Sequence, residues 1–179
     1  MNLARAQGVV DERYWIDTSP PNAANADLLH ILVPDARFVH MVRDGRDTMA
    51  SVLQEGWGPN DPQAAAHWWA ERVTAAHRAL ASVPNHLVHT VQLEALVVSD
   101  RQRQYEGLLD FLGLSDRRRM RTYFAERMPA ERGRPGAWRE RVADPRAVET
   151  AYRAAAEQLA AAGIPTHEFS PNSDPNVTS

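Results

Sequence analysis

The 179-residue chain contains no cysteine, and this absence excludes several kinds of protein. A disulfide-stapled secreted scaffold, a zinc site with cysteine ligands and a thiol nucleophile all need that side chain. The chain also lacks lysine, so all 20 of its basic side chains are arginines. A phosphate-binding loop built on lysine, as in nucleoside kinases, and a Schiff-base enzyme are therefore excluded as well.

An excess of positive charge is also absent. The 23 acidic side chains outnumber the arginines, and the formal net charge is −3, which argues against a general nucleic-acid binder. No apolar run approaches the roughly 20 residues of a membrane span, and the first 13 residues lack the apolar stretch of a signal peptide. We therefore expect a cytoplasmic protein of one domain that binds neither nucleic acid nor membrane.

Strand and helix patterns alternate along the first half of the chain. Residues 37–43, RFVHMVR, are apolar at both alternate positions in the middle, which is typical of a parallel strand buried on both faces. Residues 87–93 are a second such strand, and 14–17 are a short third candidate. This alternation predicts an α/β fold with helices on both faces of a parallel sheet. Such sheets bind ligands at the carboxyl ends of their strands.

Helical periodicity places the remaining elements. The first helix has Leu28, Leu29 and Leu32 on one face, and the last is capped by Asp144 and closed by Gly163. The polar, proline-containing residues 165–179 have the composition of a disordered tail, so the expected domain is 1–164. The expected helices cover about 22–33, the segment from the turn at 44–47 to Gly56, 63–82, 101–112, 116–126 and the segment from Pro145 to Gly163.

The strand–turn–helix over residues 37–53 carries the most chemical information. Its strand ends in Arg43, whose planar guanidinium matches phosphate or sulfate oxygens. The turn 44–47 opens a helix whose N-terminal N–H groups favour an anion, and Ser51 lies about 8 Å further along the helix axis. An alternative stays open on physical grounds alone, namely that Arg43 and the turn form a solvated cap of ordinary ion pairs.

The same segment, taken with residues 15–20 (WIDTSP), resembles the cytosolic and bacterial sulfotransferases that use 3′-phosphoadenosine 5′-phosphosulfate. In that family a strand ends in arginine and a serine follows eight residues later, and both hold the 3′-phosphate; Arg43 and Ser51 have this spacing. The turn Arg43-Asp44-Gly45-Arg46-Asp47 is also typical. The resemblance implies a three-layer α/β/α, P-loop-like fold, and sulfuryl transfer to a hydroxyl or amine acceptor without a metal.

Two later segments extend the resemblance to about residues 14–164. Residues 132–139, RGRPGAWR, resemble the family's late glycine-containing loop, which closes over the co-substrate. The resemblance therefore implies that Arg132, Gly133 and Arg134 contact the nucleotide. Residues 93–96, LEAL, stand where the family usually has Tyr-Glu-Asp-Leu, so Leu93 replaces an aromatic ring that stacks on adenine.

The family's first strand, glycine-containing loop and helix have no counterpart here. The first 14 residues contain only Gly8, with no serine or threonine beside it, so we expect a domain truncated at its N-terminus. The strands at 37–43 and 87–93 must then leave backbone groups unpaired or pair with each other. Thr18 stands where the family often has a lysine, and Asp17 is the candidate catalytic base.

Other groups of residues give weaker indications of function. The seven histidines show no metal-ligand spacing, and His40 is expected to be a satisfied core residue. Trp69 is expected in the core, while Trp57 and Trp68 are candidates for the lining of a substrate cleft.

Two functional classes stay open. One is an enzyme acting on a small-molecule acceptor. The other is a truncated, non-catalytic homologue that binds 3′-phosphoadenosine nucleotides or serves as an interaction module. Whether copies of the chain form a homo-oligomer is open as well.

Overall fold

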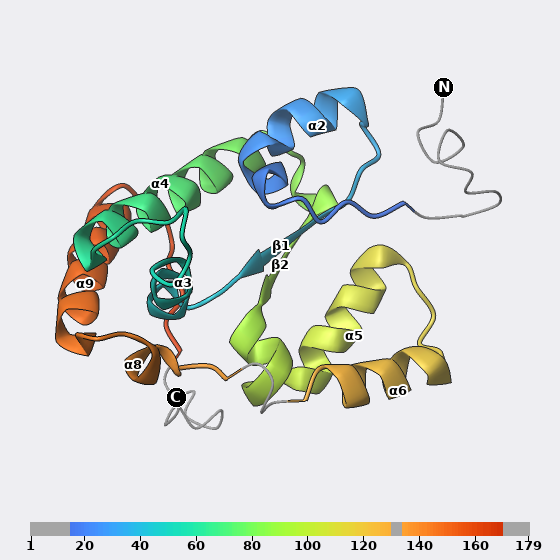
Figure 1. The fold of residues 1–179 in the computed structure, drawn as a ribbon. Helices are drawn as coiled ribbons and strands as arrows, with labels where there is room; N and C mark the ends of the chain where they lie inside the picture. Colours follow the sequence, from blue (N-terminus) through green and yellow to red (C-terminus); the bar gives the residue numbers. More distant parts are fainter. Residues whose placement is uncertain (1–14, 130–133, 170–179) are drawn as a thin grey trace, which may run out of the picture.

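The computed structural model describes residues 15–129 and 134–169, and at its centre lie two parallel strands (Figure 1). Strand β1 (Phe38–Val42) pairs with β2 (Val88–Gln92), with Phe38 opposite Val88. The two long strands are therefore confirmed. They were expected either to leave backbone groups unpaired or to pair with each other, and they pair with each other. The short strand expected at 14–17 is wrong where it can be checked, because residues 15–17 have no regular secondary structure.

Helices lie on both sides of this strand pair, so the predicted layered α/β arrangement is confirmed. Figure 1 shows α3, α4, α8 and α9 on one side and α5 and α6 on the other. The bounds in chain order are η1 (Pro20–Asn25), α2 (Ala26–Leu32), α3 (Gly45–Val52), α4 (Pro62–Leu80), η2 (Asn85–Leu87), the π-helix η3 (Ala95–Ser99), α5 (Arg101–Leu112), α6 (Arg118–Arg127), α8 (Trp138–Arg141) and α9 (Pro145–Ala161).

Capping residues set the ends of the two longest helices. The Asp61 and Asp144 carboxylates accept the N–H groups of Ala64 and Ala147, and a proline occupies the first turn of each helix. This arrangement satisfies N–H groups that a helix leaves unpaired at its start. The cap predicted at Asp144 is therefore confirmed, and Gly163 takes the left-handed conformation after α9 (φ +72°).

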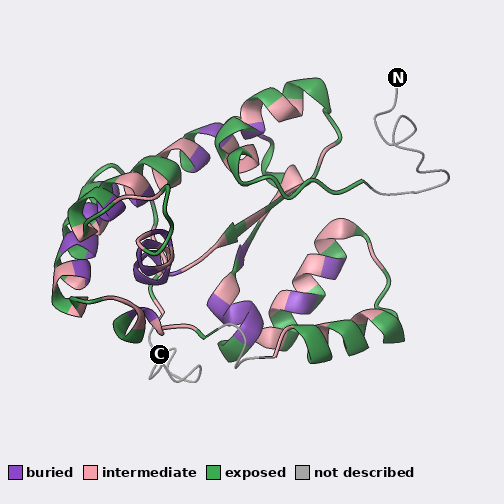
Figure 2. Ribbon diagram, viewed as in Figure 1, coloured by how far each residue is buried: buried purple, intermediate pink, exposed green. Residues whose placement is uncertain are grey.

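The largest core joins α3, α4, α8 and α9. Its members include Met49, Trp69, Trp138 and Tyr152, all 5% exposed or less, and Figure 2 shows the buried residues gathered where these helices face one another. A second cluster holds Val91 of β2 against Tyr105 and Leu109 of α5. The first core fixes the start of α3, which is separated from the end of β1 by two residues.

The apolar faces of α2 and β1 are more exposed than their sequence patterns suggest. Helix α2 buries Ala26 against Ala79 and Val83, while Leu28 and Leu32 on its leucine face are 56% and 76% exposed and Leu29 is half-buried. On β1, Val39 and Met41 are 38% and 47% exposed, although a strand buried on both faces was expected. A periodic pattern identifies a helix or strand, but which face is covered depends on the neighbouring elements.

Residues 165–169, which composition assigns to a tail, make specific contacts. The Phe169 N–H donates to the Asp44 carboxylate at 2.8 Å, and the Gln92 amide lies 2.6 Å from Nδ1 of His167. Residues 167 and 169 therefore contact β2 and the turn after β1, while residues 170–179 lie outside the described residues.

Candidate functional site

The turn after β1 is a buried network of charges. Asp44, Arg46 and Asp47 are at most 5% exposed, so the reading of this turn as a solvated cap is wrong for these three residues. The Asp44 carboxylate accepts the Arg46 N–H at 2.8 Å and pairs with its guanidinium at 2.6 Å, and the buried Glu94 carboxylate accepts the Asp44 N–H at 2.8 Å. The sequence predicts that the N–H groups at the start of α3 bind an anionic ligand. In the structure the carboxylate of Asp44 occupies that position.

Arg46 is fully used by this network. Its guanidinium lies over the rings of Trp138 and Tyr152, with its central carbon 5.5 Å and 5.2 Å from their centroids, and it pairs with Glu149 at 3.3 Å. The hydrogen bond to Asp44 is the main reason that the pKa of Arg46 is raised. Arg46 is therefore a structural residue, fixed by its partners and unable to turn toward a ligand.

Asp47 connects α3 to the late loop. Its two carboxylate oxygens accept the N–H groups of Gly136, at 2.7 Å, and Trp138, at 3.0 Å. Gly136 has a positive φ of +78°, which favours glycine, and this conformation lets the loop present its N–H groups to the carboxylate. The loop that the sequence aligned with the co-substrate is thereby held next to the carboxyl end of β1.

Arg43 differs from Arg46 in its surroundings. Its side chain is 27% exposed, and its charged contact is 3.9 Å long, to Asp47. Arg43 lines both of the cavities described below. A ligand in either cavity would therefore lie next to Arg43.

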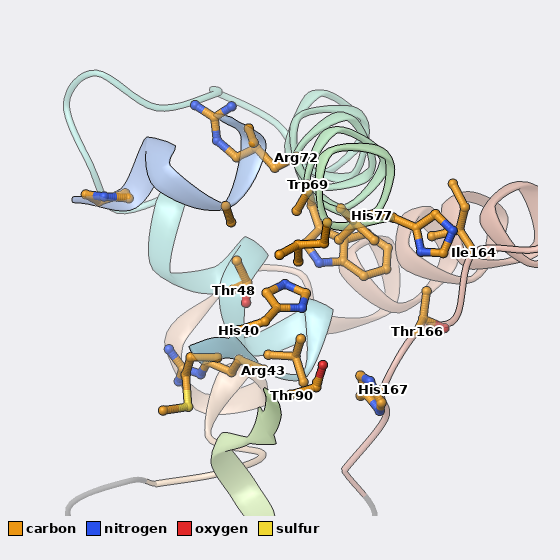
Figure 3. A pocket seen from close by; sticks show the side chains of 18 of the residues that line it. His40, Arg43, Thr48, Trp69, Arg72, His77, Thr90, Ile164, Thr166 and His167 are labelled. Atoms are coloured by element: carbon orange, nitrogen blue, oxygen red, sulfur yellow. The ribbon is translucent and has the colours of Figure 1, made fainter. Parts of the chain in front are cut away.

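The first cavity, of about 730 Å³, lies between the strands and α4 (Figure 3). Its walls are mostly apolar, and three tryptophans contribute to them, Trp57, Trp68 and Trp69. Its polar side chains are Thr48, Thr90, Thr166, His40, His77, His167, Arg43 and Arg72. No carboxylate stands among the described residues that line it, so the cavity combines an apolar wall with cationic groups.

The second cavity, of about 610 Å³, is rich in arginine. Its lining consists of Leu93, Val97, Met128, Pro129 and four arginines, Arg43, Arg127, Arg134 and Arg141. Arg134 and Arg141 also make side-chain contacts to Glu140 and Gln54. No acidic side chain lines this cavity within the described part of the chain. Several guanidinium groups beside an apolar wall suit a ligand with phosphate groups and a flat apolar ring.

The structure brings some of the predicted site residues together and leaves others apart. Arg43 and Arg134 share the second cavity. Ser51 is half-buried on α3 and lines neither cavity. Arg132 and Gly133 lie outside the described residues.

The candidate base is also apart from the cavities. Asp17 is exposed and lines neither of them. Its carboxylate accepts the Ser19 N–H at 2.8 Å, and the hydrogen bonds from Ser19 lower its pKa, which weakens it as a base.

Sequence reasoning missed several residues around Arg43. His40 was expected to be a satisfied core residue, but it is half-buried and lines the first cavity. Trp69 is in the core as expected, yet it also reaches the cavity wall, and Trp57 and Trp68 line the cavity with their ring centroids 6.3 Å apart. No sequence motif indicates Arg127 or Arg141 as site residues. They come to the second cavity from α6 and α8, which are far from β1 along the chain.

The described residues contain no group of three or more His, Asp or Glu side chains arranged to hold a metal ion. They also contain no helix with the length and apolar character needed to cross a membrane.

Comparison with known proteins decides the family. A model of the sulfotransferase family matches residues 3–118, which is more than half of the chain. The chain belongs to the sulfotransferase family. The matched residues include β1, the turn with Arg43 and β2. The family assignment therefore depends in part on the elements that surround the site.

A solved structure supports the fold of this family member. It is described as a sulfotransferase domain from the curacin biosynthetic pathway, and the two chains are 16% identical with a TM-score of 0.62. The similarity covers 88% of this chain and 66% of that domain, so the chain spans just under two thirds of its length. No curated protein matches significantly. The predicted truncation concerns residues 1–14, which lie outside the described residues, and stays a prediction.

Proposed function

We propose that this chain transfers a sulfuryl group from 3′-phosphoadenosine 5′-phosphosulfate to a hydroxyl or amine on a small molecule. The observation that carries the proposal is the position of Arg43, which directly follows β1 and lines both the arginine-rich and the apolar cavity. Sulfuryl transfer needs a donor and an acceptor on either side of one reacting centre. Two cavities that share Arg43 as a lining residue adjoin each other, as a donor site and an acceptor site must.

The arginine-rich cavity fits the nucleotide part of the donor. Its four guanidinium groups supply positive charge and N–H donors for phosphate oxygens. Leu93, Val97 and Met128 offer apolar surface for an adenine face, without the aromatic stacking that the family's usual tyrosine gives. In the proposed complex Arg43 and Arg134 hold phosphate groups, and Asp47 keeps the loop with Arg134 in place.

The apolar cavity is the proposed acceptor site. It is on the α4 side of the strands, where Arg43 and Thr48 mark its boundary with the start of α3. An acceptor there approaches the donor at the carboxyl end of β1, which is where parallel sheets usually place their ligands. We keep the cytoplasm as the proposed location, since the chemistry needs an intracellular nucleotide.

A second candidate function is binding without transfer. The observation in its favour is the place of Asp17, the base named from the sequence, which lines neither cavity. A chain without a proton acceptor at the acceptor site would hold 3′-phosphoadenosine nucleotides and leave the acceptor unreacted.

A transfer assay distinguishes the two functions. The full chain is incubated with ³⁵S-labelled donor and, separately, with 2-phenylethanol and 2-phenylethylamine, two probes of the same shape that offer a hydroxyl and an amine. The proposal predicts labelled sulfate ester or sulfamate together with an equal amount of 3′,5′-ADP. Binding of 3′,5′-ADP with no labelled product from either probe would instead support the binding module.

A further inference from the structure

The apolar cavity contains proton acceptors that the family motifs do not name. Near neutral pH, histidine and carboxylate side chains are the usual general bases. The described lining residues include no Asp or Glu, and they include three histidines, His40 on β1, His77 on α4 and His167 in the C-terminal segment. Among the described residues, a base acting inside this cavity is therefore one of these three histidines.

His40 is the histidine best placed for this role. It lies on β1, three residues before Arg43, which directly follows the strand, and Figure 3 shows its ring in the midst of the lining side chains. No described residue hydrogen-bonds the His40 ring, whereas Nδ1 of His167 lies 2.6 Å from the Gln92 amide and His77 is exposed on α4. The His40 ring thus has a nitrogen free to accept a proton from a ligand.

The surroundings of His40 keep its ring neutral. Burial lowers its pKa, and the nearby His167 and His77 lower it further. The other charged side chains of the cavity are Arg43 and Arg72, which also disfavour a second positive charge. A neutral imidazole is the form that accepts a proton.

The charges of the cavity also discriminate between acceptors. Arg43 and Arg72 are cationic, and no described lining residue offers a carboxylate to pair with an ammonium group. An alkylamine is protonated near neutral pH, so it enters this cavity against electrostatic repulsion and loses its hydration. An uncharged alcohol with an apolar body meets neither penalty and packs against Trp57, Trp68 and Val73.

We propose that the acceptor is an uncharged, apolar alcohol and that His40 is the catalytic base that takes its proton. This inference rests on the proposed function. The alcohol oxygen forms a bond to the donor sulfur while the bond from sulfur to the 5′-phosphate oxygen breaks. The electron pair of that bond leaves with 3′,5′-ADP, and the hydroxyl proton moves to the His40 ring, which later releases it to water.

The first test compares acceptors at pH 7 with the wild-type chain. The inference predicts that kcat/KM for 2-phenylethanol exceeds that for 2-phenylethylamine by about tenfold or more. Equal or faster transfer to the amine would overturn the acceptor assignment and leave the proposed sulfotransferase function intact. If neither probe is sulfated, the proposed function fails as well.

The second test replaces the base. His40→Gln is expected to lower kcat for 2-phenylethanol by about 100-fold or more, with the affinity for 3′,5′-ADP unchanged because His40 does not line the arginine-rich cavity. The matched control, His67→Gln, changes an exposed histidine paired with Glu71 on α4 and retains wild-type kcat. A His40→Gln variant that binds 3′,5′-ADP and keeps kcat within threefold of wild type would overturn the role of His40.

The pH profile separates a base from a residue that only shapes the cavity. In the wild-type chain kcat/KM should rise with pH through an apparent pKa below 6.5, and this acid limb should be missing in His40→Gln. His77→Gln removes one of the groups that lower the His40 pKa, so the acid limb should move to higher pH. An unchanged acid limb in His40→Gln would contradict the proposal.

Discussion

Two arginines three residues apart show how surroundings decide what one residue type does. Arg46 is buried, paired with Asp44 and Glu149, and placed over two aromatic rings. Arg43 is 27% exposed and has one long contact to Asp47. Because the chain has no lysine, arginine provides every permanently charged cationic side chain. The difference in burial makes Arg46 structural and leaves Arg43 accessible to a ligand.

Gly45 lies between them, directly before Arg46, and a steric reason explains why this position has no side chain. A Cβ atom at this position would lie 2.5 Å from the Tyr152 ring and 2.6 Å from the Trp69 ring. Both rings belong to the core and cannot move away freely. The sequence shows the glycine, but the two rings that require it come from residues 24 and 107 positions further along the chain.

Replacing this glycine should therefore destabilise the protein. We predict that Gly45→Ala lowers the free energy of unfolding by about 1–3 kcal/mol, as overpacking of a core does, measured by urea denaturation. The matched control is Gly56→Ala, where a Cβ atom has no neighbour within 4 Å and the change should stay within about 0.5 kcal/mol. Equal stability of the two variants would contradict the steric account.

At the scale of elements, the site depends on contacts between segments far apart in the chain. Asp47 at the start of α3 accepts N–H groups from residues 136 and 138, and Asp44 accepts the N–H of Phe169. These bonds hold the late loop and the C-terminal segment against the carboxyl end of β1. The turn after β1 is thus the point where three parts of the chain meet.

The contribution of Asp47 can be measured. Asp47→Asn keeps the size of the side chain but replaces one accepting oxygen with a donor, so one loop N–H loses its buried partner. We expect a loss of about 1.5–3 kcal/mol in the free energy of unfolding, the range for hydrogen bonds to charged groups. Asp110→Asn, at an exposed position on α5, is the control; a loss no larger than that of the control would show that Asp47 does not anchor the loop.

The elements differ in how well the sequence predicts them. Strands β1 and β2 and helices α3, α4, α5 and α9 follow from apolar periodicity and from capping residues such as Asp144. The outward leucines of α2 and the exposed Val39 and Met41 of β1 do not, because coverage depends on what packs against each face. The family motif predicts Arg43, but the buried roles of Asp44 and Asp47 depend on partners 125 and 91 residues away, respectively.

At the scale of the whole molecule, the two cavities have different chemistry and a common wall residue. One is rich in arginine, the other is largely apolar with three histidines, and Arg43 lines both. The protein as a whole has a net charge of −3, so the cationic character of the cavities is local. Anionic ligands are therefore attracted to the site itself and not to the general surface.

The stability of the whole chain should respond to pH through His40. Its pKa in the folded state lies below the ordinary value of 6.5, so the unfolded chain binds a proton there more readily than the folded chain. The free energy of unfolding is then fully retained above pH 6.5 and falls as the pH decreases below it. We expect urea denaturation to show this fall between pH 7.5 and 5.5, with a smaller fall in His40→Gln; identical slopes would contradict the assigned direction.

The most direct measurement of the central claim is a calorimetric titration of the full chain with 3′,5′-ADP. The account predicts saturable binding that weakens by about 10- to 100-fold in Arg43→Gln, since one charge-assisted hydrogen bond to phosphate contributes about 1.5–3 kcal/mol. Arg103→Gln, which removes an arginine 86% exposed on α5, should bind as the wild type does. Equal affinity of Arg43→Gln and wild type would contradict the assignment of the nucleotide site to the carboxyl end of β1.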